Sequence, residues 1–76
     1  MMIGPEAYYK FNIEGKSPAE IKEEIAQLEK EIAELKVIMK DKSHPAWNIM
    51  PSPATRLMMN EEYLETARRG YEEAMK

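Results

Sequence analysis

The feature that most constrains this chain is an apolar repeat in its first half. Between residues 17 and 39 the spacing of apolar residues alternates between four and three, and Glu and Lys fill most of the positions between them. The members of the repeat are Ile21, Ile25, Leu28, Ile32, Leu35 and Met39. This is the period of a coiled-coil seam, so the sequence predicts a long helix that must pack against other helices.

Capping signals set the limits of this helix and of a second one. At Ser17 the chain reads Ser-Pro-Ala-Glu, which supplies a capping hydroxyl, a proline at the first helical position and a glutamate three residues after the cap. A second start signal, Ser-Pro-Ala, stands at Ser52. These signals predict helices over 17–40 and 52–75, joined by a loop over 41–51.

Two further features complete the predicted fold. The N-terminal arm, 1–16, contains an aromatic stretch that predicts a helix of about two turns, with Tyr8, Phe11 and Ile13 packed across the hairpin. Gly70 interrupts the second helix, where it either permits a close helix crossing or lets the last turn fray. We therefore expect a single all-α domain over 1–76, an antiparallel two-helix hairpin with a short N-terminal helix.

A hairpin of this size leaves part of its apolar stripe uncovered. A chain of 76 residues buries only about 60% of the surface that it exposes when unfolded, and the absence of cysteine removes disulfides as a source of stability. We expect copies of the chain to associate into a helical bundle, with the number of protomers and any exchange of helices left open. The residues expected at this interface are Ile21, Ile25, Leu28, Ile32, Leu35, Met39, Leu64 and Tyr71.

Charge and composition exclude several classes of partner. The chain has 11 Lys and Arg against 14 Asp and Glu, and its net charge of -3 gives no electrostatic attraction for duplex nucleic acid or an anionic membrane. Its apolar runs are too short for a transmembrane helix or for the core of a signal peptide. We expect a soluble cytoplasmic protein.

The residues that could carry chemistry do not form a catalytic pattern. His44 is the only histidine, so a two-histidine metal site cannot form, and the Glu-x-x-His motif of metal-binding bundles is absent. The seam helix is rich in glutamate, but its inward positions are aliphatic, so the glutamates are expected on a solvated face. No nucleophile elbow surrounds Ser43 or Ser52. We expect no enzymatic activity, no metal and no cofactor.

The segment 44–56 combines groups that can bind a small anionic ligand. An indole can stack on a base, and the hydroxyls and the arginine near a helix N-terminus can hold phosphate together with its free N–H groups. The arm of the same or a neighbouring copy could add two tyrosines and a lysine. The predicted ligand-binding residues are Tyr8, Tyr9, Lys10, Trp47, Ser52, Thr55 and Arg56.

Structural interpretations of the same residues stay open. In these, Ser52 only caps the second helix, Trp47 covers the open end of the bundle, and Arg56 pairs with a glutamate. Arg68 and Arg69 lie among glutamates of the second helix, so intrahelical ion pairs are expected for both.

Methionine is the remaining compositional signal. The chain has seven methionines, and Met50, Met58 and Met59 lie in or near the predicted loop. Because methionine side chains adapt to irregular surfaces, these residues could form a docking patch for a partner protein.

Several short segments of the chain together resemble a known group of proteins. They are Tyr8-Tyr9, Gly15-Lys16-Ser17, the Glu- and Lys-rich seam helix, Pro51-Ser52-x-x-Thr55-Arg56 and Glu62-Tyr63-Leu64-Glu65-x-Ala67. In these segments the chain resembles short helical proteins encoded by phages and prophages of gut bacteria. The resemblance implies a cytoplasmic accessory protein with no assigned chemistry. The hairpin layout is also similar to that of small oligomeric phage proteins that sequester the cyclic-nucleotide signals of bacterial defence.

Three functions follow from these patterns. The first is a non-enzymatic anti-defence protein of the phage type, which sequesters a nucleotide signal at an oligomer interface. The second is a protein that inhibits or links a host defence enzyme by binding to it. The third is a purely structural helical assembly module. The sequence identifies neither the ligand nor the partner.

Overall fold

The two long helices begin at the capping signals seen in the sequence. The computed structural model describes residues 3–76. Helix α2 spans Pro18–Lys40, and its capping box is formed: the Ser17 hydroxyl accepts the Glu20 N–H at 3.3 Å while the Glu20 carboxylate accepts the Ser17 N–H at 3.1 Å. Helix α3 spans Pro53–Ala74 after its cap at Ser52. Both helices therefore lie within one residue of the predicted limits.

Two shorter helices flank the hairpin. Helix α1 spans Pro5–Asn12, and the 3-10 helix η1 spans Pro45–Asn48 within the connection between α2 and α3. Gly15, between α1 and α2, has a φ of 78°, which a residue without a Cβ adopts at no steric cost, so the chain can turn sharply into α2.

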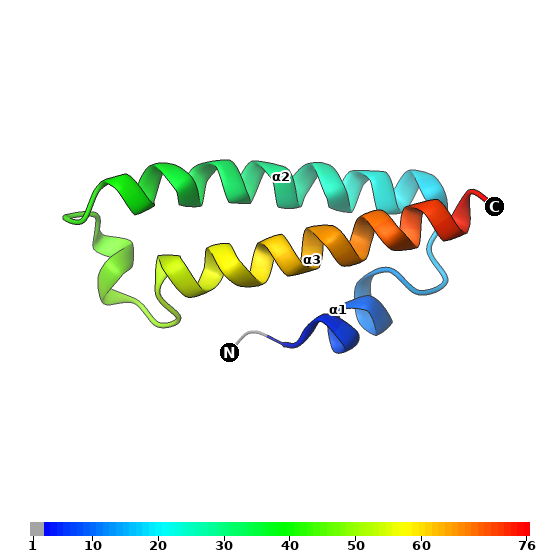
Figure 1. Ribbon diagram of the computed structural model, residues 1–76, viewed down its shortest axis with the longest axis horizontal. Helices are drawn as coiled ribbons and strands as arrows, with labels where there is room; N and C mark the ends of the chain where they lie inside the picture. The colour runs from blue at the N-terminus through cyan, green and yellow to red at the C-terminus, as the bar shows by residue number, and fades with distance from the viewer. Residues whose placement is uncertain (1–2) are drawn as a thin grey trace.

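The chain folds back once on itself. Figure 1 shows α2 and α3 side by side and antiparallel, η1 at the turn that joins them, and α1 beside the C-terminal half of α3. The prediction of an all-α antiparallel hairpin with a short N-terminal helix is confirmed. Association of the hairpin into a larger bundle stays a prediction.

The core lies where the three α-helices meet. Ile21 and Leu28 of α2 pack with Tyr63 and Ala67 of α3, and the arm adds Tyr8 and Ile13. Of the residues predicted at an oligomer interface, half are buried inside the single chain, namely Ile21, Leu28, Ile32 and Leu35. The other half are only partly covered, namely Ile25, Met39, Leu64 and Tyr71.

The expectation that Phe11 packs across the hairpin is wrong, because its side chain is 74% exposed. Tyr8 and Ile13 are buried as expected. The covered face of α1 passes through Tyr8, Tyr9 and Asn12, and at about 100° per residue Phe11 falls outside that face. A helix of two turns has room for only one such face.

The two adjacent arginines form different ion pairs. Arg69 pairs with Glu65 of its own helix, as predicted. The same prediction is wrong for Arg68, whose guanidinium reaches Glu29 of α2 at 3.1 Å. Both Glu29 and Arg68 flank the seam on the same side of the antiparallel pair, which is where helices of this kind exchange charges.

The shape is that of a rod. The radius of gyration is 13.5 Å, against about 11 Å for a compact domain of this length, and the principal extents are 45 × 20 × 13 Å. Among the described helices, none has both the length and the apolar character to cross a lipid bilayer. The elongated shape leaves long flanks of the two main helices in contact with solvent.

Candidate functional site

The residues predicted to bind a ligand fall into two groups at different ends of the hairpin (Figure 1). Tyr8, Tyr9 and Lys10 lie on α1, which packs against the C-terminal half of α3. The others lie at the turn between α2 and α3, namely Trp47, Ser52, Thr55 and Arg56. A single chain therefore does not bring the seven residues together.

Tyr8 anchors the arm to the hairpin. Its ring stacks on Tyr63 with 4.4 Å between centroids and 13° between planes, and its hydroxyl donates to Glu24 Oε1 at 2.8 Å. Burial and the neighbouring Glu24 carboxylate raise the pKa of Tyr8 well above its ordinary range. Within one chain, Tyr8 is occupied by these contacts and is not open for stacking on a base.

Trp47 closes the end of α2. Its indole Nε1 donates to the carbonyl oxygens of Ile38 at 3.3 Å and Asp41 at 3.0 Å, at the C-terminal end of α2. Each of these carbonyls also accepts a backbone N–H, from Asp41 and His44 respectively. Lys42 Nζ lies over the ring at 4.3 Å from its centroid, a cation-π geometry. In these contacts Trp47 covers the end of the hairpin, as the structural interpretation proposed.

Three of the predicted ligand-binding residues lie at the start of α3. The Ser52 hydroxyl accepts the Thr55 N–H at 3.4 Å and donates to the Thr55 hydroxyl at 3.2 Å, so both are used in capping. Arg56 follows directly, and this partly buried residue forms no ion pair within the described chain. The expected pairing of Arg56 with a glutamate is therefore not found there.

Asn60 is a feature that the sequence did not reveal. It is buried, and its amide donates to the Arg56 carbonyl oxygen at 2.8 Å. From the sequence alone, an asparagine in a helix is expected on the surface. Here it can be buried because the carbonyl oxygen of Arg56, one helical turn earlier, accepts a hydrogen bond from its amide.

Apolar side chains are exposed close to the turn. Met50 is 84% exposed, Ile49 is 53% exposed and Met58 is 54% exposed. All three lie in the loop before α3 or within its first two turns. Met59, which the sequence grouped with them, instead packs against the core. We call Ile49, Met50 and Met58 the turn-end patch.

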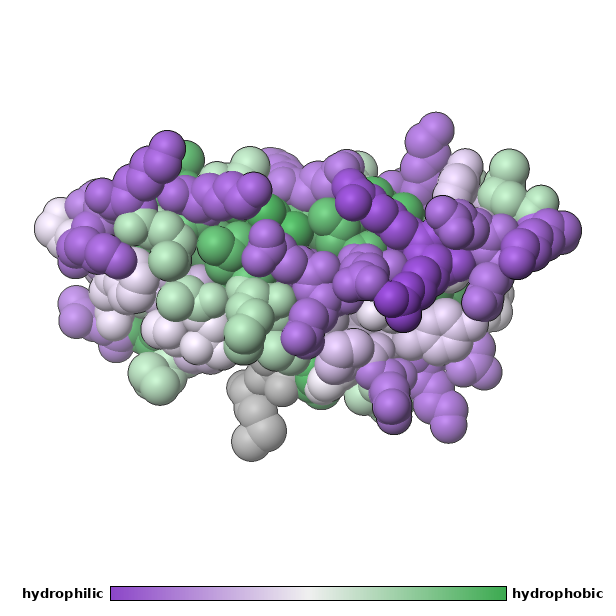
Figure 2. Space-filling view, viewed as in Figure 1, coloured by the Kyte–Doolittle hydropathy of each residue, from purple (hydrophilic) through white to green (hydrophobic). Residues whose placement is uncertain are grey.

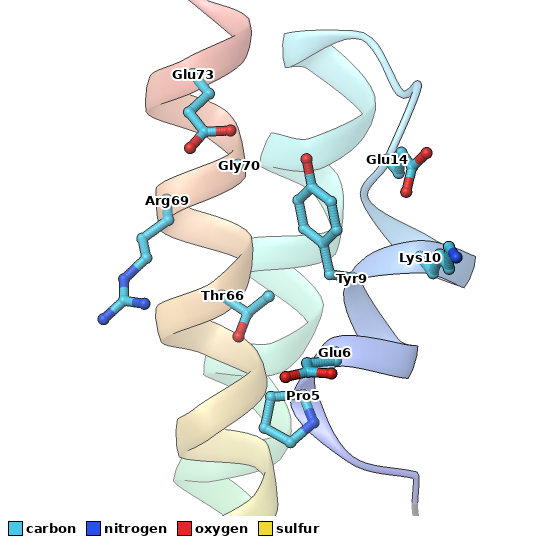
Figure 3. Close-up of a pocket in the computed structure, with 9 residues that line it drawn as sticks. All are labelled: Pro5, Glu6, Tyr9, Lys10, Glu14, Thr66, Arg69, Gly70 and Glu73. Carbon is cyan, nitrogen blue, oxygen red and sulfur yellow. The ribbon is translucent and has the colours of Figure 1, made fainter.

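A groove of about 610 Å³ separates α1 from α3. Figure 3 shows the Tyr9 ring standing in it beside Gly70, with the Glu14 and Glu73 carboxylates on either side. Lys10 also lines this groove. No sequence pattern predicted this groove. Gly70 lines it, but a Cβ at Gly70 would collide with Ile13 Cγ2, so Ile13 occupies the place of the missing side chain.

Groups that could carry catalysis serve structural roles. His44 Nδ1 accepts the Ala46 N–H at 3.0 Å and so caps η1. Hydrogen bonds from Ser43 hold the pKa of Asp41 below its usual range. In residues 3–76 no three His, Asp or Glu side chains are placed to hold a metal ion together.

Comparisons with protein-family models, with curated proteins and with solved structures found no match to this chain. The function is therefore inferred from the residues themselves and from their geometry.

Proposed function

We propose that this protein is a non-enzymatic binding protein whose turn-end patch contacts a partner protein. The observation that carries the proposal is the exposure of three large apolar side chains, Ile49, Met50 and Met58, next to the one irregular connection of the hairpin. The three side chains fall within residues 49–58, and exposed apolar side chains concentrated in one short segment favour contact with another macromolecule. The two methionines can adapt their shape to the surface that they meet.

The turn that carries the patch is held in place before any partner binds. The Trp47 indole bonds two carbonyl groups at the end of α2, and His44 caps η1. A loop fixed in this way loses little conformational entropy on binding, so more of the contact energy appears as affinity. The geometry therefore supports the loop as a recognition element.

The biological setting is part of the same proposal. The resemblance to phage and prophage proteins suggests a host defence enzyme as the partner, with this protein as its inhibitor or adaptor. In that setting the protein would act in the bacterial cytoplasm and would need no cofactor.

Affinity capture from a bacterial lysate tests the proposal with matched variants. Met50→Asp and Met58→Asp place a charge in the patch without touching the core, and each should remove a captured partner that the wild type retains. Phe11→Asp is the control, because Phe11 is also exposed and apolar but lies on α1. Quantitative mass spectrometry of the captured proteins is the readout.

The outcomes separate the alternatives. A partner lost with both methionine variants but retained with Phe11→Asp supports the turn-end patch. A partner lost only with Phe11→Asp would move the binding surface to α1 and contradict the proposal. If no protein is captured by the wild type, the structural assembly module becomes the better account.

A second candidate function is sequestration of a nucleotide signal at the turn. It is favoured by Arg56, which forms no ion pair within the described residues and lies within one helical turn of Ser52 and Thr55 along α3. Arginine can bind phosphate through two parallel hydrogen bonds. A nucleotide here would need an aromatic group other than the buried Tyr8 for stacking.

Calorimetric titration with a cyclic dinucleotide tests this second candidate. Arg56→Ala should abolish binding while the oligomeric state stays the same, and Arg68→Ala, which removes an arginine elsewhere on the hairpin, should retain it. Equal affinity in the wild type and Arg56→Ala would exclude the site.

A further inference from the structure

The two flanks of the seam between α2 and α3 differ in what covers them. On one flank α1 covers the helices, with Tyr8 reaching Glu24 of α2 and Ile13 lying against Gly70 of α3. The opposite flank is a groove of about 520 Å³ that no residue of α1 lines. Figure 2 shows apolar side chains along the middle of the seam, with charged side chains beside them. We call this opposite flank the open flank.

The open flank has an apolar floor with charged edges. Ile32 of α2 and Leu64 of α3 lie in the groove, and Leu64 remains partly exposed. Seven residues toward the turn, Met39 and Leu57 occupy the equivalent heptad positions and are also partly covered. The partly covered apolar surface thus follows the seam over one heptad.

Charged side chains of both signs line the groove, namely Lys36 of α2 and Glu61, Glu65, Arg68, Arg69 and Glu72 of α3. Arg68 of α3 lies opposite Glu29 of α2, as their ion pair shows. Because the helices are antiparallel, moving seven residues in opposite directions from this pair brings Lys36 opposite Glu61, and both line the groove. At the heights of these two pairs, therefore, α2 carries one sign of charge and α3 carries the other.

This pattern is complementary to itself. A two-fold axis parallel to the helices places α2 of one copy over α3 of a second copy at the same height. Lys36 then meets Glu61 of the second copy, and Glu29 meets Arg68 of the second copy. Both of these contacts join opposite charges, and the apolar floors of both copies face each other.

The exposed area is consistent with a missing partner. The chain exposes 5430 Å², whereas a compact monomer of 8.9 kDa would expose about 4,800 Å². The excess of about 600 Å² is close to the roughly 800 Å² that each partner buries in an interface of standard size.

We propose that the open flank is the contact surface for a second copy of this chain, and that the two copies form a four-helix bundle with a two-fold axis parallel to the helices. The surface is distinct from the turn-end patch, so this inference does not depend on the proposed function. The two copies would leave both turn-end loops at the same end of the bundle.

Charge reversal with mixing tests the pairing directly. In a dimer of Lys36→Glu, position 36 of each copy meets Glu61 of the other, which creates two Glu-Glu contacts. In a dimer of Glu61→Lys, the same two positions create two Lys-Lys contacts. Each single variant should dimerise roughly tenfold or more weakly than the wild type, because two attractions become two repulsions. In an equimolar mixture of the two variants, position 36 of each copy meets a charge of opposite sign at position 61 of the other. Heterodimers should therefore form with nearly wild-type affinity.

Mixing also separates contacts between copies from contacts within one chain. Each single variant keeps a like-charge pair inside its own hairpin, and mixing cannot relieve it. Restored dimerisation in the mixture therefore reports only the contact between copies. Sedimentation equilibrium gives the dissociation constants, and circular dichroism shows that both variants remain helical.

Three results would overturn the proposal. They are a wild-type protein that stays monomeric up to millimolar concentration, single variants that dimerise as tightly as the wild type, and folded single variants whose mixture forms no heterodimer.

Discussion

Gly70 of α3 and Ile13 of the arm fit together because position 70 has no side chain. A Cβ built at Gly70 would collide with Cγ2 of Ile13, which is almost fully buried. The glycine thus permits a close crossing, one of the two roles that the sequence left open. The contact holds the end of the arm against α3 and so covers one flank of the hairpin.

Gly70→Ala should destabilise the protein despite the better helix propensity of alanine. The propensity gain is about 1 kcal/mol, but overpacking against a buried isoleucine costs about 1–3 kcal/mol. In an Ile13→Ala background the clash is removed, so the same substitution should become stabilising by about 1 kcal/mol. Urea unfolding of the four proteins measures the change of sign. Destabilisation of equal size in both backgrounds would show that Ile13 is not the neighbour that matters.

Tyr8→Phe should weaken the attachment of the arm. It removes the hydrogen bond to Glu24 and keeps the ring that stacks on Tyr63, and we expect a loss of about 1–2 kcal/mol. Tyr9→Phe is the matched control, because the Tyr9 hydroxyl bonds to no residue of the described chain and its loss should change stability little. Hydrogen exchange of the α1 amides should report faster opening in Tyr8→Phe alone.

Stability should fall in alkaline solution because of the same tyrosine. Burial and Glu24 raise the pKa of Tyr8 above its ordinary value of 10.0, so the folded state binds this proton more tightly than the unfolded state. The contribution is complete below pH 10 and is lost as the pH rises above it. Unfolding midpoints measured between pH 8 and 11 should therefore decline less steeply in Tyr8→Phe than in the wild type. Parallel curves would contradict this assignment.

Trp47→Phe should loosen the turn. The substitution keeps an aromatic ring but removes the indole hydrogen bonds to the carbonyl groups of Ile38 and Asp41, which keep only their backbone donors, at a cost of about 1–2 kcal/mol. Lys42→Ala removes only the cation over the ring and should cost no more than about 1 kcal/mol. Thermal unfolding followed by circular dichroism ranks the two variants. A larger effect for Lys42→Ala would mean that the indole N–H does not hold the end of α2.

Most of the fold could be predicted from the sequence, because its local signals agree with one another. The heptad repeat from Ile21 to Met39 and the caps at Ser17 and Ser52 depend on neighbours in the chain, so they could be read directly. The pairing of Arg68 with Glu29 and the exposure of Phe11 depend on how separate helices are turned toward each other. Those orientations are set by tertiary contacts such as Gly70 with Ile13, which local patterns do not encode.

The candidate site was harder to predict for the same reason. Tyr8 and Trp47 have the chemistry to stack on a ligand, but their polar atoms are already bonded to Glu24 and to the end of α2. Residue type alone does not distinguish an aromatic group that binds a ligand from one that completes the fold. The sequence grouped Met50 and Met58 as a possible docking patch, but only the structure shows that Ile49 is exposed beside them and that Met59 packs against the core.

The central claim is that α1 covers one flank of the hairpin and a second copy covers the other. Native mass spectrometry of the wild-type protein over a range of concentrations tests it most directly. We predict a species with twice the mass of the 8.9 kDa chain, whose share grows with concentration. A single species at the mass of one chain, at every concentration, would contradict the account.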